Sequence, residues 1–152
     1  MSDPKSSSKP EKLDALLCFT LYAATNTFIR AYNARLSPFG LTYEQYVVLQ
    51  LLWQEGSKRR TAICERLTLD QAAVDSELDR LEQAKLLMRE RPADGSDDPC
   101  IRLTEDGIGL EGALYDVQHS IACEAEVGED TNDFIRTELS ALMRRMRTRS
   151  GE

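Results

Sequence analysis

Four cysteines and five tyrosines are the side chains of this sequence whose chemistry could be redox-active. Cys18 lies among apolar residues in LLCFTLYAATNTFIRAYNARL, and three tyrosines follow it at separations of 4, 14 and 25 residues: Tyr22, Tyr32 and Tyr43. A cysteine on an apolar helix usually fills the core, and the tyrosines could equally be core or interface aromatics. A thiolate can instead be oxidised by a peroxide to a sulfenic acid, and tyrosine hydroxyls are suitable donors to it. Both interpretations are open on these residues alone.

The remaining cysteines, Cys64, Cys100 and Cys123, are widely spread, and no C-x-x-C pair occurs. With a single histidine, His119, this spacing argues against a zinc site. In a reducing cytosol we expect free thiols, so any disulfide would be transient and functional. Cys64 lies on an apolar face and is interpreted as core packing, and Cys100 has no assigned role. His119 lies one turn before Cys123 and could assist that thiol, although a surface histidine is the simpler interpretation.

Composition excludes several classes of protein. The 152 residues are 41% hydrophobic and 30% charged, which is typical of a globular chain. No apolar run approaches the roughly 20 residues of a membrane helix, and MSDPKSSSKPEK lacks the apolar stretch of a secretory signal. We therefore expect a cytoplasmic protein with no membrane partner. The net charge of −7 gives no support to nucleic-acid binding, which needs a basic face, although a local basic patch is compatible with it.

The elements that position these side chains are mostly helical. Residues 1–10 are predicted to be a disordered tail and 11–152 a single domain. Apolar residues at helical spacing predict a helix over about 12–36, ended by SPFG. A second helix follows and ends at Gly56, with Thr42 as its N-cap and Gln45 completing a capping box.

Two closely spaced helices, RRTAICERL and LDQAAVDSELDRLEQAKL, then predict a helix-turn-helix over about 59–86, with Asp70 as an N-cap. LMRERPADGSDDPCIRLT predicts a β-hairpin wing over about 87–104. A helix is predicted from Glu105 to about Glu126, and a last one from Thr131 to about Arg147. The predicted fold class is therefore mainly α, a winged helix-turn-helix. Its terminal helices, about 12–36 and 105–148, are expected to form a two-fold dimerisation region, giving a homodimer.

The sequence resembles MarR-type winged-helix regulators, and among them the OhrR branch of organic-peroxide-sensing repressors. The segments that carry the resemblance are LCFTLYAATNTFIRAY, LTYEQYVVLQLLW, ERLTLD, LDRLEQAKLL and LTEDG. It implies that an organic hydroperoxide oxidises Cys18, whose thiolate is held by Tyr22, Tyr32 and Tyr43. It also implies that Cys123 is the resolving cysteine of the two-cysteine type, forming an intersubunit disulfide with Cys18. No cofactor is implied.

The part expected to contact DNA departs from the family. The predicted recognition helix carries five acidic side chains against two basic ones, and Asp97 stands about where the family has a wing arginine. Carboxylates facing phosphates repel them, and in a groove they accept usefully only from cytosine amino groups. Basic candidates for backbone contacts remain, and two polar residues are candidates for reading bases. The basic candidates are Lys58, Arg59, Arg60, Arg89, Arg91 and Arg102, and the polar ones are Gln71 and Ser76.

Two functions follow. The first is a redox-sensing transcriptional repressor that leaves its double-stranded DNA operator when Cys18 is oxidised. The second is a thiol-switch dimer of the same fold that binds DNA weakly or not at all and acts through a protein or a small molecule. We do not expect an enzyme such as a thiol peroxidase, because the sequence offers no second catalytic constellation.

Overall fold

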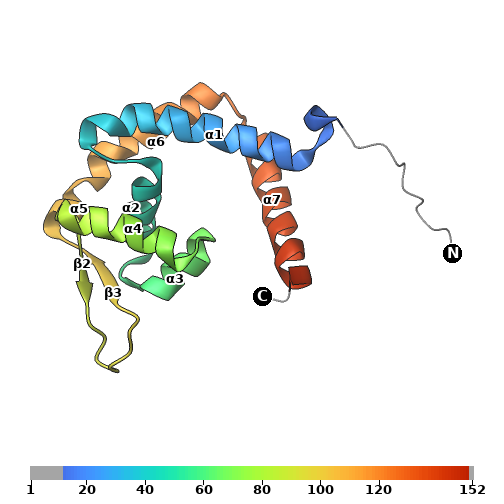
Figure 1. Cartoon of the computed structure of the whole chain (residues 1–152). Helices are drawn as coiled ribbons and strands as arrows, with labels where there is room; N and C mark the ends of the chain where they lie inside the picture. Colours follow the sequence, from blue (N-terminus) through green and yellow to red (C-terminus); the bar gives the residue numbers. More distant parts are fainter. Residues whose placement is uncertain (1–11, 151–152) are drawn as a thin grey trace. The chain divides into compact units, whose positions relative to one another are not determined.

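A computed structural model describes residues 12–150 of the chain (Figure 1). The predicted tail, residues 1–10, lies outside the described residues. The described helices are α1 (Leu17–Leu36), α2 (Tyr43–Glu55), α3 (Arg60–Leu67), α4 (Gln71–Gln83), α5 (Glu105–Gly109), α6 (Glu111–Ala125) and α7 (Glu129–Ser150). The described strands are β1 (Lys58–Arg59), β2 (Leu87–Glu90) and β3 (Cys100–Leu103). This arrangement confirms the predicted fold class, a mainly α winged helix-turn-helix.

The chain forms two compact units, one ending at Glu111 and the other starting at Gly112. The core of the first unit is built from side chains of α2, α3, α4 and the sheet. Its most deeply buried members include Val48, Leu49, Ile63, Val74, Leu78 and Ile101. The expectation of a single domain over residues 11–152 stays a prediction.

The first long helix begins later than predicted. A short 3-10 turn, η1 (Leu13–Ala15), comes first, and Leu16 then adopts an extended conformation before α1 begins at Leu17. The other end agrees with the prediction, because η2 (Ser37–Phe39) and the left-handed Gly40 (φ +68°) follow Leu36. The late start places Cys18 in the first turn of α1.

Helix α2 starts and ends as its local sequence predicts. Thr42 Oγ1 accepts a hydrogen bond from the Gln45 amide, and Gln45 Oε1 accepts one from the Thr42 amide, which completes the capping box. Gly56 ends the helix with φ +74°. The Tyr43 amide also donates to Asn33 Oδ1 at 2.7 Å, which ties the start of α2 to α1.

The helix-turn-helix is made by α3 and α4. Thr68 closes α3 in the left-handed conformation (φ +56°), and Asp70 Oδ1 then caps α4 by accepting the Ala73 amide at 2.8 Å. Helix α4 is amphipathic and buries Val74, Leu78 and Leu81, which leaves its opposite side to solvent. The predicted cap and turn are both confirmed.

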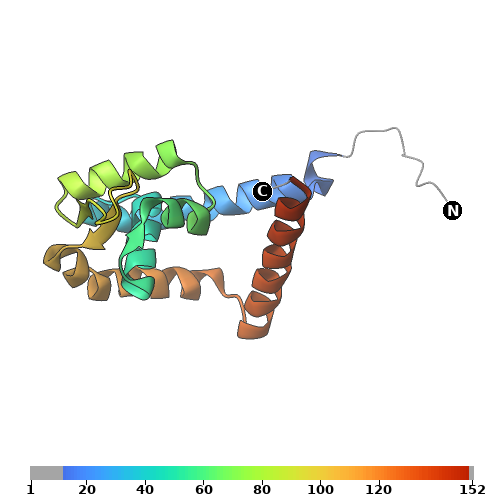
Figure 2. The same cartoon turned by 90° about the horizontal axis from the view of Figure 1, so that it is seen from below.

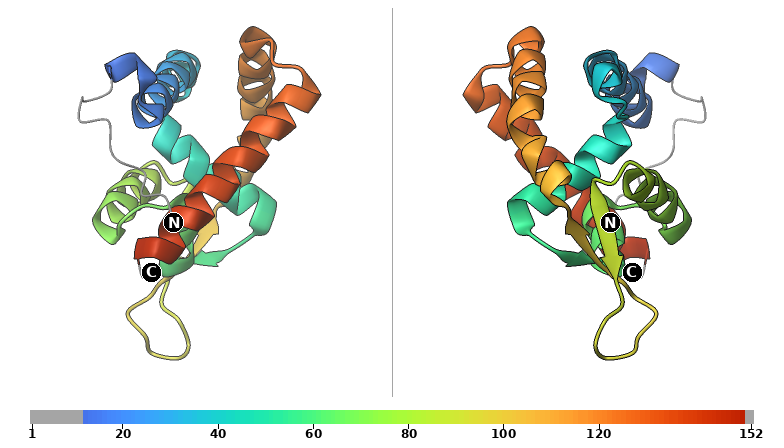
Figure 3. Two further views of the ribbon diagram at one scale, coloured as in Figure 1. Left: turned by 90° about the vertical axis from the view of Figure 1, so that its right-hand side faces the viewer. Right: turned by 90° about the vertical axis from the view of Figure 1, so that its left-hand side faces the viewer.

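The wing is part of a three-stranded antiparallel sheet in the order β1-β3-β2. Strands β2 and β3 pair from Leu87 opposite Leu103 to Glu90 opposite Cys100, as the predicted hairpin requires. Figures 1 and 3 show their connecting loop projecting beyond the helices of its unit. Strand β1 was not predicted: its two residues were expected at the entrance to a helix, but they pair with β3. A two-residue strand has no periodicity that a sequence could display.

The single helix predicted from Glu105 is divided in two. Helix α5 ends at Gly109, and α6 begins after Leu110. Gly107 and Gly109 are weak helix formers, and the Gly107 carbonyl accepts a hydrogen bond from Trp53 Nε1 at 2.9 Å. This hydrogen bond ties the short helix α5 to α2.

In the second unit, the chain turns sharply after α6 into the straight helix α7 (Figure 2). Helix α7 is longer than predicted, because it begins at Glu129 rather than Thr131 and ends at Ser150 rather than Arg147. None of the helices in residues 12–150 is long and apolar enough to cross a membrane.

Candidate thiol site and nucleic-acid interface

Cys18 is an exposed, free thiol in the first turn of α1. Tyr22 lies one turn further along the same helix, at a spacing that places two side chains on one face. Its ring is 69% exposed. The predicted sensing thiol and the first of its tyrosines therefore lie on one open face of α1.

The other two predicted tyrosines lie together. The ring centroids of Tyr32 and Tyr43 are 5.0 Å apart, and Tyr46 stacks on Tyr32 at 5.4 Å. Burial raises the pKa of all three phenols above the ordinary value, and neighbouring tyrosines add to it for Tyr32 and Tyr46. The pKa of Tyr46 reaches about 12. These hydroxyls therefore keep their protons at neutral pH and can donate hydrogen bonds.

The tyrosine cluster and Cys18 are far apart within one chain. Cys18 and Tyr32 both belong to α1 and are separated by 14 residues, which at 1.5 Å per residue is about 21 Å along the helix axis. Of the three predicted tyrosines, Tyr32 and Tyr43 therefore contact each other, and only Tyr22 lies within one helical turn of Cys18. Tyr46 is a member of the cluster that sequence reasoning missed, although its spacing of three residues from Tyr43 on a helix was a usable signal.

The remaining cysteines differ in their surroundings. Cys123 is exposed on α6, and its Sγ lies 3.7 Å from Nε2 of His119. Cys64 is half-buried on α3, where burial raises the pKa of its thiol. Cys100 is half-buried at the start of β3. Cys18 and Cys123 are therefore the two exposed thiols, and they belong to different units of the chain.

On the recognition helix α4, the two predicted base-reading residues face solvent. Gln71 and Ser76 are both exposed, whereas Val74 between them is buried. Both side chains are therefore open to a ligand on the outer face of α4.

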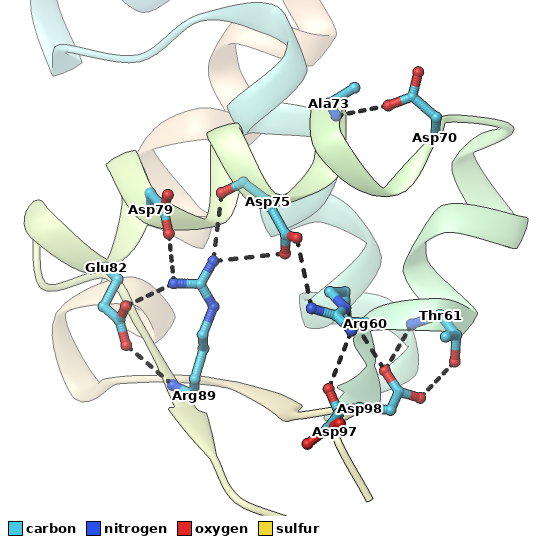
Figure 4. A network of polar contacts seen from close by, with 10 residues as sticks. All are labelled: Arg60, Thr61, Asp70, Ala73, Asp75, Asp79, Glu82, Arg89, Asp97 and Asp98. Carbon is cyan, nitrogen blue, oxygen red and sulfur yellow. Dashed lines mark hydrogen bonds and ion pairs between the residues drawn. The ribbon is translucent and has the colours of Figure 1, made fainter.

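Arg89, at the third position of β2, holds the carboxylates of α4 (Figure 4). Its Nη1 lies 2.6 Å from Asp79 Oδ1 and 2.9 Å from Glu82 Oε2, and its Nη2 lies 3.9 Å from Asp75 Oδ1. The Arg89 side chain is only 23% exposed. Its guanidinium, predicted to contact phosphate, is therefore already paired with three carboxylates of its own chain.

Arg60, at the start of α3, makes a second set of such contacts (Figure 4). Its guanidinium lies 3.5 Å from Asp75 and 3.9 Å from Asp98 and also donates to the Asp97 carbonyl. Asp98 in turn accepts the amide and hydroxyl hydrogens of Thr61. Burial opposes ionisation of Asp98, but these hydrogen bonds and the arginines outweigh it and lower its pKa. Arg60 thus joins the base of the wing to α3 and α4.

The other predicted basic contacts divide into paired and unpaired residues. Arg59 pairs with Asp94 at 2.7 Å, Lys58 with Glu55 at 3.3 Å, and Arg102 with Glu90. Arg91 is exposed and forms no ion pair with any residue that the structure describes. It lines an open groove of about 550 Å³ between α4 and the wing, together with Arg60 and Arg89. Arg91 is the predicted cation most available to an anionic ligand.

Every acidic residue of the recognition segment has a partner in its own chain. Asp70 caps α4, and Glu77 accepts a hydrogen bond from Gln45 and lies 3.7 Å from Arg80. The other three, Asp75, Asp79 and Glu82, belong to the Arg89 and Arg60 contacts described above. The segment that looked repulsive to DNA in the sequence is therefore largely compensated in the fold.

The fold and these two sites define a winged-helix protein with exposed thiols, and comparison with known proteins gives its family. A model of the MarR family matches residues 41–94. The chain is 33% identical over 142 residues to the HTH-type transcriptional regulator TtmR of Methylorubrum extorquens (strain PA1), covering 93% of this chain and 73% of TtmR. It is 34% identical over 120 residues to the organic hydroperoxide resistance transcriptional regulator of Bacillus subtilis (strain 168), covering 78% and 82%. The chain belongs to the MarR family.

Solved structures of AbfR from Staphylococcus epidermidis share the fold. Reduced AbfR bound to DNA matches with a TM-score of 0.73 and 29% identity, over 86% of this chain and 91% of AbfR. Disulfide-formed AbfR matches with a TM-score of 0.59 and 27% identity, over 90% of each chain. The resemblance to MarR-type regulators, including an organic hydroperoxide regulator, is confirmed.

Proposed function

We propose that this chain is a DNA-binding transcriptional repressor that releases its operator when an organic hydroperoxide oxidises Cys18. The observation that carries the proposal is the exposed Cys18 thiol at the start of α1, in a chain 34% identical to an organic hydroperoxide resistance regulator. Exposure matters because a thiol reacts with a peroxide only where the oxidant can reach the sulfur.

DNA is contacted by the outer face of α4 and by the wing. Gln71 and Ser76 are the residues that read bases, and Arg91 contacts a phosphate. Arg60 and Arg89, predicted to contact DNA, also pair with carboxylates of α4. We propose that these ion pairs hold α4 against the wing and so fix the geometry with which α4 enters the groove. AbfR, which has the same fold, has been solved bound to DNA.

The peroxide-sensing site is completed by a second copy of the chain. Tyr32 lies about 21 Å from Cys18 along α1, and Tyr43 packs against Tyr32, so their hydroxyls can serve the thiolate of a second copy but not their own. The apolar side chains of Leu13 in η1, 58% exposed, and Leu17 at the start of α1, 57% exposed, provide an unfilled surface for that copy. A homodimer is therefore required for sensing, which is consistent with the predicted dimerisation by terminal helices.

The redox steps balance without a cofactor. The Cys18 thiolate attacks one peroxide oxygen, so that an S–O bond forms, the O–O bond breaks and the alcohol leaves with a proton. Sulfur is thereby oxidised to a sulfenic acid. The Cys123 thiol of the other subunit then attacks that sulfur, forming the disulfide and releasing water.

Fluorescence anisotropy with the upstream region of the protein's own gene tests the repressor function. Reduced protein should bind with a strong salt dependence, and organic hydroperoxide should weaken binding by about 100-fold, within the usual range of a coupling between two sites. Cys18→Ser should bind equally well and ignore the peroxide. Release of the Cys18→Ser variant by peroxide would remove Cys18 from the mechanism.

Non-reducing gel electrophoresis tests the disulfide separately. Oxidised wild type should migrate as a covalent dimer, and Cys123→Ser should migrate as a monomer. A cross-linked band in Cys123→Ser would show that another thiol resolves Cys18.

A second function is favoured by one observation. Five of the six predicted basic contacts are already paired with carboxylates of the same chain: Lys58, Arg59, Arg60, Arg89 and Arg102. A thiol-switch dimer that acts through a protein or a small molecule would have such a surface. Absence of DNA binding by the reduced protein at low salt, about 50 mM, would favour this alternative, because the phosphate contribution is strongest there.

A further inference from the structure

Helix α6 carries three reactive or aromatic side chains in one line. Tyr115, His119 and Cys123 follow one another at intervals of four residues and therefore share a face of the helix. Cys123 Sγ lies 3.7 Å from His119 Nε2. The rings of Tyr115 and His119 are nearly parallel, at an angle of 8°, with centroids 6.3 Å apart. All three side chains are exposed.

This geometry suits a transfer of the thiol proton. A neutral imidazole nitrogen within hydrogen-bond reach of a thiol can accept its proton, and the resulting thiolate is the nucleophilic form of cysteine. The phenol ring of Tyr115 lies parallel to the imidazole at a centroid distance of 6.3 Å, within the range of aromatic contacts. Tyr115 is therefore the aromatic neighbour that can favour this orientation of the His119 ring.

We propose that His119 is a positioning residue for the thiol of Cys123, that it takes up the thiol proton, and that Tyr115 holds its ring in place. The inference about the target of this thiolate rests on the proposed function, in which the electrophile is the sulfenic acid at Cys18. In that step the S–S bond forms as the S–O bond breaks. The leaving hydroxide takes the proton held on His119 and departs as water.

The position of the His119 ring beside Cys123 is not explained by an ion pair between His119 and a charged residue. Asp116 lies one turn before His119, but no ion pair joins it to the imidazole in the part of the chain that the structure describes. Within the described residues of α6 and α7, the sulfur of Cys123 and the ring of Tyr115 are the polar and aromatic partners of His119. The Cys123 thiol is therefore the group with which the His119 imidazole can exchange a proton.

Alkylation of the fully reduced protein tests the pair without any oxidation step. Iodoacetamide is added from pH 6 to pH 9.5, and the rate at each cysteine is followed by peptide mass spectrometry. His119→Gln should slow alkylation of Cys123 about 5- to 10-fold at pH 7, because only a few per cent of an ordinary thiol is ionised there. The two rates should converge near about pH 9.5, where thiols ionise without help. A loss of structure would not give this convergence.

Matched variants locate the effect. Cys18, which is also exposed, serves as an internal standard and should react equally in wild type and His119→Gln. Gln118→Ala changes the adjacent exposed residue and should leave Cys123 unaffected. Tyr115→Phe keeps the ring and should behave as wild type, whereas Tyr115→Leu should slow Cys123 two- to threefold, roughly the effect of a weak aromatic contact. Equal Cys123 rates in wild type and His119→Gln at every pH would overturn the proposal.

Oxidation with cumene hydroperoxide separates this inference from the proposed function. In His119→Gln at pH 7 the disulfide should form more slowly, and the sulfenic acid at Cys18, trapped with dimedone, should accumulate. If wild type forms no disulfide but its Cys123 alkylation depends on His119, the proton transfer stands and the Cys18–Cys123 pairing fails. If disulfide formation and alkylation are both indifferent to His119, the pairing stands and the proton transfer fails.

Discussion

The polar side chains around α4 and those at the start of α1 differ in whether they are paired within the chain. Around α4 and the wing, Arg60 and Arg89 bind the carboxylates that would otherwise repel DNA. On α1, Cys18 and Tyr22 face solvent, and the tyrosine cluster that could hold the thiolate lies about 21 Å away along the helix. The ion pairs around α4 are therefore complete in one chain, whereas one chain does not bring the tyrosine cluster to Cys18.

In the proposed function, only the thiol site needs a second copy of the chain. An ion-pair network that is half-buried in one chain keeps its geometry whatever the oligomeric state, because its partners are always present. A thiol whose hydrogen-bond donors must come from another molecule responds only in the assembled protein.

Gly107→Ala should break the DNA-reading region outright. A Cβ at this position would lie 2.0 Å from the Leu86 carbonyl oxygen, a backbone atom that cannot move aside cheaply. Leu86 leads into β2, so the clash would separate α5 from the wing. We expect a loss of about 3 kcal/mol in the free energy of unfolding, measured by urea denaturation.

Gly109→Ala is the matched control, because nothing lies within 4 Å of its added Cβ. Alanine is the better helix former, so this variant should be as stable as wild type or slightly more stable. Equal stability of the two variants would show that α5 is not held against the wing as closely as the structure has it.

Arg89→Met should weaken the region without a steric clash. The substitution keeps the apolar stem but removes the cation from Asp79 and Glu82, while Asp75 keeps its ion pair with Arg60. We expect a loss of about 2 kcal/mol in the free energy of unfolding, since Arg89 is mostly buried. Arg102→Met, which removes an exposed pair with Glu90, should cost about 0.5 kcal/mol or less.

Salt dependence distinguishes the structural arginine from the DNA contact. If Arg89 positions α4, Arg89→Met should lower DNA affinity while the slope of log K against log salt stays the same. Arg91→Ala should reduce that slope by about 0.9 for each phosphate contact removed. A reduced slope in Arg89→Met would mean that its guanidinium leaves the carboxylates to bind phosphate.

The local signals of the fold could be read from the sequence. Thr42 with Gln45, Asp70 and Gly56 mark helix ends through contacts spanning at most four residues, and each acts as predicted. Strand β1 could not be read, because its two residues gain their conformation by pairing with β3, about 40 positions later. The local sequence around β1 does not indicate a pairing partner so distant along the chain.

The candidate sites divide in the same way. The exposed Cys18 and the pairing of Tyr32 with Tyr43 follow from residues that the sequence singled out. The ion pairs of Arg89 could not be predicted from the sequence, because its carboxylate partners lie on α4 and the approach of α4 to β2 is a tertiary contact. Counting charges along the chain therefore overstated how acidic the DNA-reading surface is.

The sensing region can be tested by mixing subunits. Tyr32→Phe with Tyr43→Phe keeps both rings and removes both hydroxyls. We expect oxidation of Cys18 by organic hydroperoxide to slow at least about tenfold, because even one hydrogen bond to a charged group contributes about 1.5 kcal/mol or more. Stopped-flow trapping of the sulfenic acid would measure the rate.

Mixed dimers then show which copy supplies the hydroxyls. In a dimer of the double-Phe chain with a Cys18→Ser chain, the single remaining Cys18 faces intact tyrosines only if these come from the other copy. Its oxidation should then return to the rate seen in a dimer of wild type with Cys18→Ser. Oxidation that stays slow would mean that each chain serves its own thiol, contrary to the separation along α1.

Asp94→Asn should give the smallest effect, confined to the wing tip. The hydrogen bond from Arg59, with further help from Ser96, lowers the pKa of Asp94 to about 2. Because this pKa lies below that of an unfolded aspartate, near 3.9, the stabilisation is complete above about pH 4 and is lost as the pH falls towards 2. Urea midpoints of wild type and Asp94→Asn should therefore differ slightly at pH 7 and converge by about pH 2.

Asp97→Asn is the control, because its carboxylate forms no hydrogen bond or ion pair with the residues described, and its midpoint should follow wild type at every pH. The comparison is sensitive even though the pair is exposed, since both variants remove one negative charge from the same loop. A constant difference between Asp94→Asn and wild type down to pH 2 would mean that Arg59 does not hold the carboxylate.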